Sequence, residues 1–221
     1  MSLRFLHGWL DDAAQRWLRD AVFTVVEEAP LFTPRMPRSG RPFSVAMTSC
    51  CEVGWVSDVD GYRYAQAQPV TGRPWPPLPD TVRDLWRAVA GYPADCDSCL
   101  VNAYGAGAKM GLHQDRDEET FAAPVVSVSL GDTAVFRFGG TSRRGPTRSV
   151  RLASGDVVVF GGDDRLMFHG IDRVLAGSST LLAEGGRLNL TLRRVRPFAP
   201  EDAAHETPRS NEQEVEGADE T

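Results

Sequence analysis

The segment Arg187–Arg193 is the feature that most constrains the fold of this 221-residue chain. It reads Arg-Leu-Asn-Leu-Thr-Leu-Arg, a strict alternation of polar residues and leucines. Because successive side chains of a strand point to opposite faces, the pattern predicts a β-strand with one apolar and one polar face. The leucines require a packed layer on their side of the strand. The polar side chains face either solvent or a polar cavity, and the period alone is compatible with both.

Short apolar runs of strand length follow one another beyond Cys99, and Gly-Asp and Gly-Gly pairs separate them. We expect strands over residues 125–130, 134–138, 157–160 and 188–195. Many short strands with glycine-containing turns are typical of a jelly roll. The second half of the chain is therefore predicted to be an all-β body.

The first hundred residues have a different pattern, with two amphipathic helices. Asp11 or Asp12 is expected to cap the first helix, and Asp80 the second. Between the helices, the segment from Phe32 to Pro42 combines prolines with three arginines and predicts a mobile loop. The apolar stripe of the first helix comprises Trp17, Leu18, Ala21, Val22 and Val25.

Two of the four histidines lie in the predicted β body. His113 and Asp115 are two positions apart, so in an extended segment both side chains point to the same face. With His169 they make two histidines and one carboxylate, the set that suits non-haem Fe(II) oxygenases because it leaves coordination positions open. The alternative is that His113 lies in a turn and His169 in the core, since a His-x-Asp pair alone is weak evidence.

The polar face of the 187–193 strand offers a second candidate site. If this face lines a cavity, Arg187 and Arg193 are placed to bind a dicarboxylate through charge-assisted bidentate hydrogen bonds. 2-Oxoglutarate is such a molecule. The strand spans roughly 20 Å between the two arginines, which is longer than 2-oxoglutarate, so either both side chains lean inward or only one binds an end.

Several motifs occur together in a fixed order: Asn102-x-Tyr104, Gly107-Ala108-Lys109, Leu112-His113-Gln114-Asp115-x-Asp117-Glu118, Val126–Gly131, Phe168-His169-Gly170 and Arg187-x-Asn189-x-Thr191-x-Arg193. From about Ser44 to Arg193 the chain thereby resembles the AlkB-type Fe(II)/2-oxoglutarate dioxygenases, which oxidatively remove alkyl groups from nucleic-acid bases. The resemblance is strongest to their bacterial DNA-repair branch. It implies a mainly β fold, a double-stranded β-helix (jelly roll) with an N-terminal α/β extension that forms a substrate lid.

The resemblance also implies roles for individual residues. Three metal ligands would bind Fe(II) and act in catalysis: His113, Asp115 and His169. Six residues would bind 2-oxoglutarate: Asn102, Tyr104, Tyr62, Arg187, Asn189 and Arg193. Five would contact the substrate base: Trp55, Asp117, Arg143, Tyr62 and Tyr64. Without the resemblance, the aromatic residues would be assigned to the core or to turns, and Asp117 to a solvated turn.

The implied organisation is a single domain with a tail. Residues 1–95 form the α/β extension and nucleotide-recognition lid, 96–198 the Fe(II)/2-oxoglutarate core, and 199–221 a disordered tail. Residues 201–221 contain eight acids and one arginine, so the formal net charge of −6 leaves the rest of the chain at about +1. The body is therefore not repelled by phosphate.

The implied function is oxidative demethylation of 1-methyladenine and 3-methylcytosine in single- or double-stranded DNA, or in RNA. Two alternatives remain open: a dioxygenase that acts on a small molecule or a protein side chain, and a non-catalytic jelly roll that binds nucleic acid. The chain has no apolar run of membrane-spanning length, and its first residues lack the basic-then-apolar pattern of a signal peptide. We expect a cytoplasmic monomer with no membrane partner and reduced, buried cysteines.

Two features depart from the family pattern. Phe160 stands where the bacterial relatives carry a tryptophan, and the segment from Thr33 to Pro42 is longer and richer in arginine than their lid. The range of substrates depends on such segments.

Overall fold

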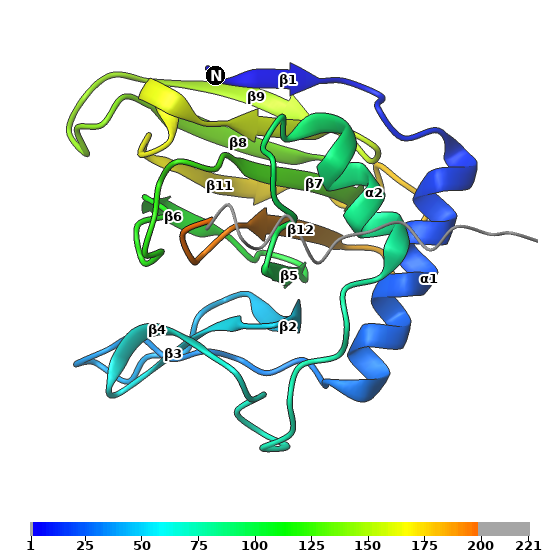
Figure 1. Ribbon diagram of the computed structural model, residues 1–221. Helices are drawn as coiled ribbons and strands as arrows, with labels where there is room; N and C mark the ends of the chain where they lie inside the picture. The colour runs from blue at the N-terminus through cyan, green and yellow to red at the C-terminus, as the bar shows by residue number, and fades with distance from the viewer. Residues whose placement is uncertain (1, 199–221) are drawn as a thin grey trace, which may run out of the picture.

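Two antiparallel sheets face each other in the computed structural model, which describes residues 2–198 (Figure 1). The larger sheet has the order β1 (Arg4–Leu6), β10 (Val157–Phe160), β7 (Val125–Gly131), β12 (Arg187–Arg193), β5 (Ser98–Tyr104) and β2 (Ala46–Cys51). The smaller has the order β6 (Met110–His113), β11 (His169–Val174), β8 (Ala134–Gly139) and β9 (Thr147–Leu152). The mainly β, jelly-roll prediction is confirmed.

Two helices, α1 (Asp12–Glu28) and α2 (Asp80–Val89), cover the outer face of the larger sheet (Figure 1). The three leucines of β12 pack in the same apolar cluster as the buried residues of both helices. Leu190 and Leu192 are 1% and 0% exposed. The apolar half of the alternating pattern therefore forms the layer between sheet and helices.

A second apolar cluster fills part of the space between the two sheets. It includes Val158 and Phe160 from the larger sheet and Phe136 and Ile171 from the smaller. The polar side chains of β12 face this interior too, since its residues alternate between the two faces. All four are buried, with 2–7% exposure, so the polar face of the strand lines a cavity and is not solvated. They are Arg187, Asn189, Thr191 and Arg193.

The helix predictions were partly wrong. Asp11 caps α1 by accepting a hydrogen bond from the Ala14 amide at 2.8 Å, but Trp17 is 71% exposed. The buried stripe is the narrower set Leu18, Val22 and Val25, and Trp17 lies beside it on the solvent edge. Asp80 does not cap α2: it is the first helical residue, and the N-cap position is occupied by Pro79, whose side chain has no hydrogen-bond acceptor.

The extension before residue 96 contributes β1 and β2 to the larger sheet and adds the hairpin of β3 (Gly54–Asp58) and β4 (Gly61–Ala65). The hairpin was not predicted. The segment expected to be a mobile loop is hydrogen-bonded to its surroundings. Its Phe32 amide donates to Met47, and its Arg35 amide donates to Ser57, at 2.8 and 3.1 Å.

Three other predictions concern the tail, membrane-spanning segments and the cysteines. The tail 199–221 lies outside the described residues. Within residues 2–198, no helix is long and apolar enough to cross a membrane. All four cysteines are free thiols, and three of them are buried.

Candidate active site

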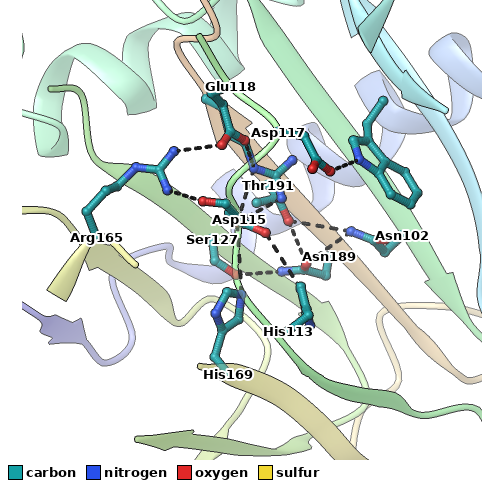
Figure 2. A network of polar contacts seen from close by, with 12 residues as sticks. Asn102, His113, Asp115, Asp117, Glu118, Ser127, Arg165, His169, Asn189 and Thr191 are labelled. Carbon is teal, nitrogen blue, oxygen red and sulfur yellow. Dashed lines mark hydrogen bonds and ion pairs between the residues drawn. The ribbon is translucent and has the colours of Figure 1, made fainter. Parts of the chain in front are cut away.

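The three predicted metal ligands meet at one edge of the smaller sheet (Figure 2). His113 ends β6, His169 begins β11, and the two are paired directly across these strands. Asp115 follows two residues after β6. His113 Nε2 lies 3.6 Å from Asp115 Oδ1, and His169 Nε2 lies 3.9 Å from Asp115 Oδ2. The three candidate ligand atoms lie within 4.8 Å of one another, so one ion can contact all three.

Backbone carbonyls orient both histidines. His113 Nδ1–H donates to the Gly111 carbonyl at 2.9 Å, and His169 Nδ1–H donates to the Met167 carbonyl at 3.2 Å. This leaves each Nε2 lone pair toward Asp115, the arrangement typical of metal-bound histidines. Burial, together with the neighbouring His113, lowers the pKa of His169 to about 4. At neutral pH His169 is therefore uncharged and able to bind a metal.

Asp115 is held as a carboxylate by its neighbours. Burial alone would raise its pKa, but Arg193 and the two histidines outweigh burial and keep the pKa below the ordinary value. Arg193 donates to Asp115 Oδ2 from Nη2 at 2.9 Å and from Nε at 3.1 Å. Arg165 donates to the Asp115 backbone carbonyl at 2.7 Å. The ligand is thus fixed through both its side chain and its backbone.

Gly170 explains why β6 lies so close to β11. A Cβ atom at this position would lie 2.5 Å from the Met110 carbonyl oxygen and 2.8 Å from that of Gly111, distances that a side chain does not tolerate. The glycine therefore permits the strand pairing that brings His113 to His169.

A second group of polar side chains lies on the larger sheet, facing the metal ligands. Arg187 is 2% exposed and donates through Nη2 to Ser129 Oγ at 2.9 Å, while its Nε and Nη1 have no protein hydrogen-bond partner. Asn102 Oδ1 and Arg193 Nη1 are also buried without a hydrogen bond. In residues 2–198 no carboxylate lies within ion-pair distance of Arg187. Buried donors without partners indicate a ligand, and a buried cation indicates an anionic one.

All thirteen residues predicted for the site line a single cavity of about 450 Å³. We use "mouth" for its exposed side, formed by Trp55, Tyr62, Asp117 and Arg143. Trp55 stacks on Tyr62 with 5.5 Å between ring centroids, and its Nε1–H donates to Asp117 Oδ2 at 2.8 Å. Arg143 lies over the Phe168 ring at 5.9 Å. The mouth thus combines a flat aromatic wall with one carboxylate.

Comparison with known proteins identifies the family. A family profile described as "2OG-Fe(II) oxygenase superfamily" matches residues 2–193. The "Alpha-ketoglutarate-dependent dioxygenase AlkB homolog" of Caulobacter vibrioides is 56% identical over 189 residues, covering 86% of each chain. "Alpha-ketoglutarate-dependent dioxygenase AlkB" of Escherichia coli is 43% identical over 188 residues, covering 83% of this chain and 86% of its own. The chain belongs to the AlkB-type dioxygenases of this superfamily.

A solved structure has the same fold. "The structure of OsALKBH1" superposes with a TM-score of 0.73 at 32% identity, covering 87% of this chain and 96% of that one. The protein is therefore an AlkB-type, alpha-ketoglutarate-dependent dioxygenase with a jelly-roll core.

Within this AlkB-type site, two predicted residues have contacts that their assigned roles did not anticipate. Tyr62 lies at the mouth, 47% exposed, where it contacts Trp55 and the Met36 sulfur; its assignment to 2-oxoglutarate stays a prediction. The Tyr64 hydroxyl is used within the protein, since it donates to Glu118 Oε1 at 2.6 Å. Burial raises the pKa of Tyr64 well above its ordinary value.

Sequence reasoning assigned no role to three polar groups of the site. Ser127 and Ser129 on β7 accept hydrogen bonds from Asn189 and Arg187. Arg165 lies 50 residues from Asp115 in sequence, and no pattern around it indicates a role in the site. The pattern around the two serines does indicate a role, because they interrupt the apolar run from Val125 at alternate positions and so share a face of the strand.

Proposed function

We propose that this AlkB-type dioxygenase removes alkyl groups oxidatively from nucleic-acid bases, with alkylated DNA as its main substrate. One observation carries the proposal. A single cavity joins a three-residue metal set and an unpaired buried arginine to a mouth made of a stacked tryptophan and a carboxylate. A flat, positively charged base fits such a mouth.

The donor set fits Fe(II) and 2-oxoglutarate. His113, Asp115 and His169 would hold the metal, because two neutral imidazoles and one carboxylate leave positions open for other ligands. Arg187, with two free nitrogen donors, would bind a carboxylate of 2-oxoglutarate, and Asn102 lies on the same wall. Fe(II) bound there would supply the oxidation of the alkyl carbon by O₂, coupled to conversion of 2-oxoglutarate to succinate and CO₂, and the alkyl carbon would leave the base as an aldehyde.

The mouth would position the base. Trp55 offers a stacking surface, which is worth about 1–3 kcal/mol per base. Asp117 has its Oδ2 bound to Trp55, so Oδ1 is the oxygen that would accept from an exocyclic amine. A base inside a duplex cannot reach the cavity between the two sheets, so the nucleotide must be flipped out. Alkylation of the pairing edge lowers that cost, which favours 1-methyladenine and 3-methylcytosine.

Iron-dependent succinate release tests this function. We expect release to rise severalfold when an oligonucleotide containing 1-methyladenine or 3-methylcytosine is added, with loss of the methyl group confirmed by mass spectrometry. The unmethylated oligonucleotide of the same sequence is the control. Equal release with both oligonucleotides would favour the small-molecule or protein-side-chain alternative. Succinate release with DNA and RNA oligonucleotides, each single- and double-stranded, shows which nucleic acid is preferred. The monomeric state and the cytoplasmic location stay predictions.

A pair of variants separates the two roles in the mouth. Asp117→Asn retains an oxygen that can accept from Trp55 but removes the charge, so it should lower repair of the cationic lesions about tenfold more than repair of a neutral etheno adduct. Trp55→Ala should lower repair of 1-methyladenine, 3-methylcytosine and the etheno adduct alike, because every base has a π-face. Steady-state repair of matched oligonucleotides measures both effects.

Trp55→Phe is the matched control, since it keeps a ring but removes the Nε1–H that binds Asp117. If Asp117→Asn reduces every substrate equally, Asp117 supports the fold of the mouth and does not read the charge of the base.

A further inference from the structure

Glu118 lies between the two arginines that contact Asp115. Its side chain is 1% exposed. Glu118 Oε2 lies 3.2 Å from Arg165 Nη2, and its Oε1 lies 3.3 Å from Arg193 Nε. Figure 2 shows Glu118 and Asp115 side by side, with Arg165 reaching both. Arg193 therefore contacts both carboxylates, whereas Arg165 contacts the Glu118 carboxylate and the Asp115 backbone carbonyl.

The four groups balance one another in charge. Counted over the whole residue, Arg165 and Arg193 are 2% and 5% exposed, and Asp115 and Glu118 are each 7% exposed. At this depth an unbalanced charge is strongly unfavourable, because few water molecules are available to screen it. Without Glu118, Asp115 would be the one carboxylate left in this group to offset both guanidiniums, although only Arg193 contacts its side chain, and Asp115 must also donate electrons to a metal. Because Arg193 also pairs with Glu118, its positive charge withdraws less electron density from Asp115 than it would if Asp115 were its single partner.

A tyrosine extends this network to the base-recognition hairpin. Tyr64 on β4 is paired directly with Trp55 on β3. Tyr64 donates to Glu118 Oε1 at 2.6 Å, and Trp55 donates to Asp117 Oδ2 at 2.8 Å. Two side chains that are neighbours across the hairpin thus bind two acids that are neighbours in sequence, two and three positions after the metal ligand Asp115.

We propose that Glu118 is a positioning residue with two roles: it maintains Asp115 as a strong metal ligand by pairing with Arg193 and Arg165, and through Tyr64 it fixes the hairpin over the site. The base role of the hairpin rests on the proposed function, whereas the metal role and the attachment of the hairpin do not. Glu118 contacts neither the metal ligands' donor atoms nor the cavity's unpaired nitrogens, so its effect acts through the two arginines and Tyr64.

The first test measures Mn(II) binding to the purified full-length chain by titration calorimetry. Glu118→Gln keeps the shape of the side chain and an oxygen that accepts from Tyr64, but it removes the charge. We expect Mn(II) affinity to fall by about 10–100-fold, the range typical when a partner of a metal ligand is lost. Tyr64→Phe is the matched control, because it leaves all four charges in place, and its Mn(II) affinity should stay within about twofold of wild type.

The second test follows the hairpin by hydrogen–deuterium exchange. Tyr64→Phe should speed exchange of the amides in residues 54–65, because one of the two side-chain bonds from the hairpin to residues 117–118 is lost. Glu118→Gln, which retains an acceptor for Tyr64, should change exchange there less. This measurement decides the hairpin role even if Glu118→Gln fails to fold.

The outcomes are separate from those of the proposed function. Unchanged Mn(II) affinity in a folded Glu118→Gln variant overturns the metal role, and so does an equal loss in Tyr64→Phe, because that pattern reports only disturbed packing. Unchanged exchange in Tyr64→Phe overturns the hairpin role. Neither measurement uses a nucleic acid, so failure of the methylated oligonucleotides as substrates leaves both results interpretable.

Discussion

Replacement of His113, Asp115 or His169 by alanine is expected to abolish succinate release. Three protein ligands are the minimum for this type of site, and loss of one removes a donor that no other side chain in the described part of the cavity is placed to replace. Mn(II) affinity, measured by titration calorimetry, should fall by more than the ~10–100-fold that follows from loss of a partner of a metal ligand. The three variants should therefore rank below Glu118→Gln in Mn(II) affinity.

The fold should survive in the two histidine variants. Each histidine donates one hydrogen bond to a backbone carbonyl. The His113 side chain is 40% exposed, so thermal unfolding of His113→Ala, monitored by circular dichroism, should shift little. His169→Ala should shift more, because the ring is buried against Phe136 and Phe160. Asp115→Ala is different, because it also removes the main partner of the buried Arg193. We expect lower stability for this variant, and Asp115→Asn is the conservative comparison. Wild-type turnover in any of the three alanine variants would show that the metal lies elsewhere.

The sequence predicted the strands that appear as short apolar or strictly alternating runs between turn residues. The residues expected for β10 match the observed strand, and those of β7, β8 and β12 match within a few residues. The hairpin of β3 and β4 was missed, because its strands place Trp55 and Tyr62 toward a cavity and so lack an apolar face that repeats. Trp17 was misplaced because a stripe of apolar residues does not reveal how wide the contact with the sheet is.

The candidate site was also predictable only in part. His113 and His169 are far apart in sequence. They were assigned to one site because the chain has few histidines and because of the family resemblance. The polar face of β12 was ambiguous until the structure placed a second sheet over it, with Arg187 at 2% exposure. The network of Arg165 and Glu118 could not be found from spacing, since it depends on how residues 115–118 pack against a turn 50 residues later.

Arg187→Met is expected to have opposite effects on 2-oxoglutarate binding and on stability. The Arg187 guanidinium is buried with one hydrogen bond to Ser129 and a contact with the Tyr104 ring. Burial lowers the pKa of Arg187, which shows that its charge is poorly compensated there. Methionine fills similar volume without charge, so the free energy of unfolding of the ligand-free variant should be unchanged or higher.

Binding of 2-oxoglutarate should respond in the other direction. Removal of one partner from a buried charge pair costs about 2–5 kcal/mol, which corresponds to a loss of affinity of roughly 30-fold to several thousandfold. Titration calorimetry on the Mn(II)-loaded protein measures this loss, and denaturant unfolding of the metal-free protein measures stability. Arg173→Met, on the exposed part of β11, is the matched control and should change neither.

The combination of the two signs is what distinguishes a ligand-binding arginine from a structural one. If Arg187 supported the fold, its loss would lower stability and would weaken 2-oxoglutarate only as a consequence of that change. A variant that unfolds at lower denaturant concentration yet retains wild-type affinity would contradict the assignment. A variant that is at least as stable but binds 2-oxoglutarate weakly would show that the two unpaired nitrogens of Arg187 exist to meet a carboxylate.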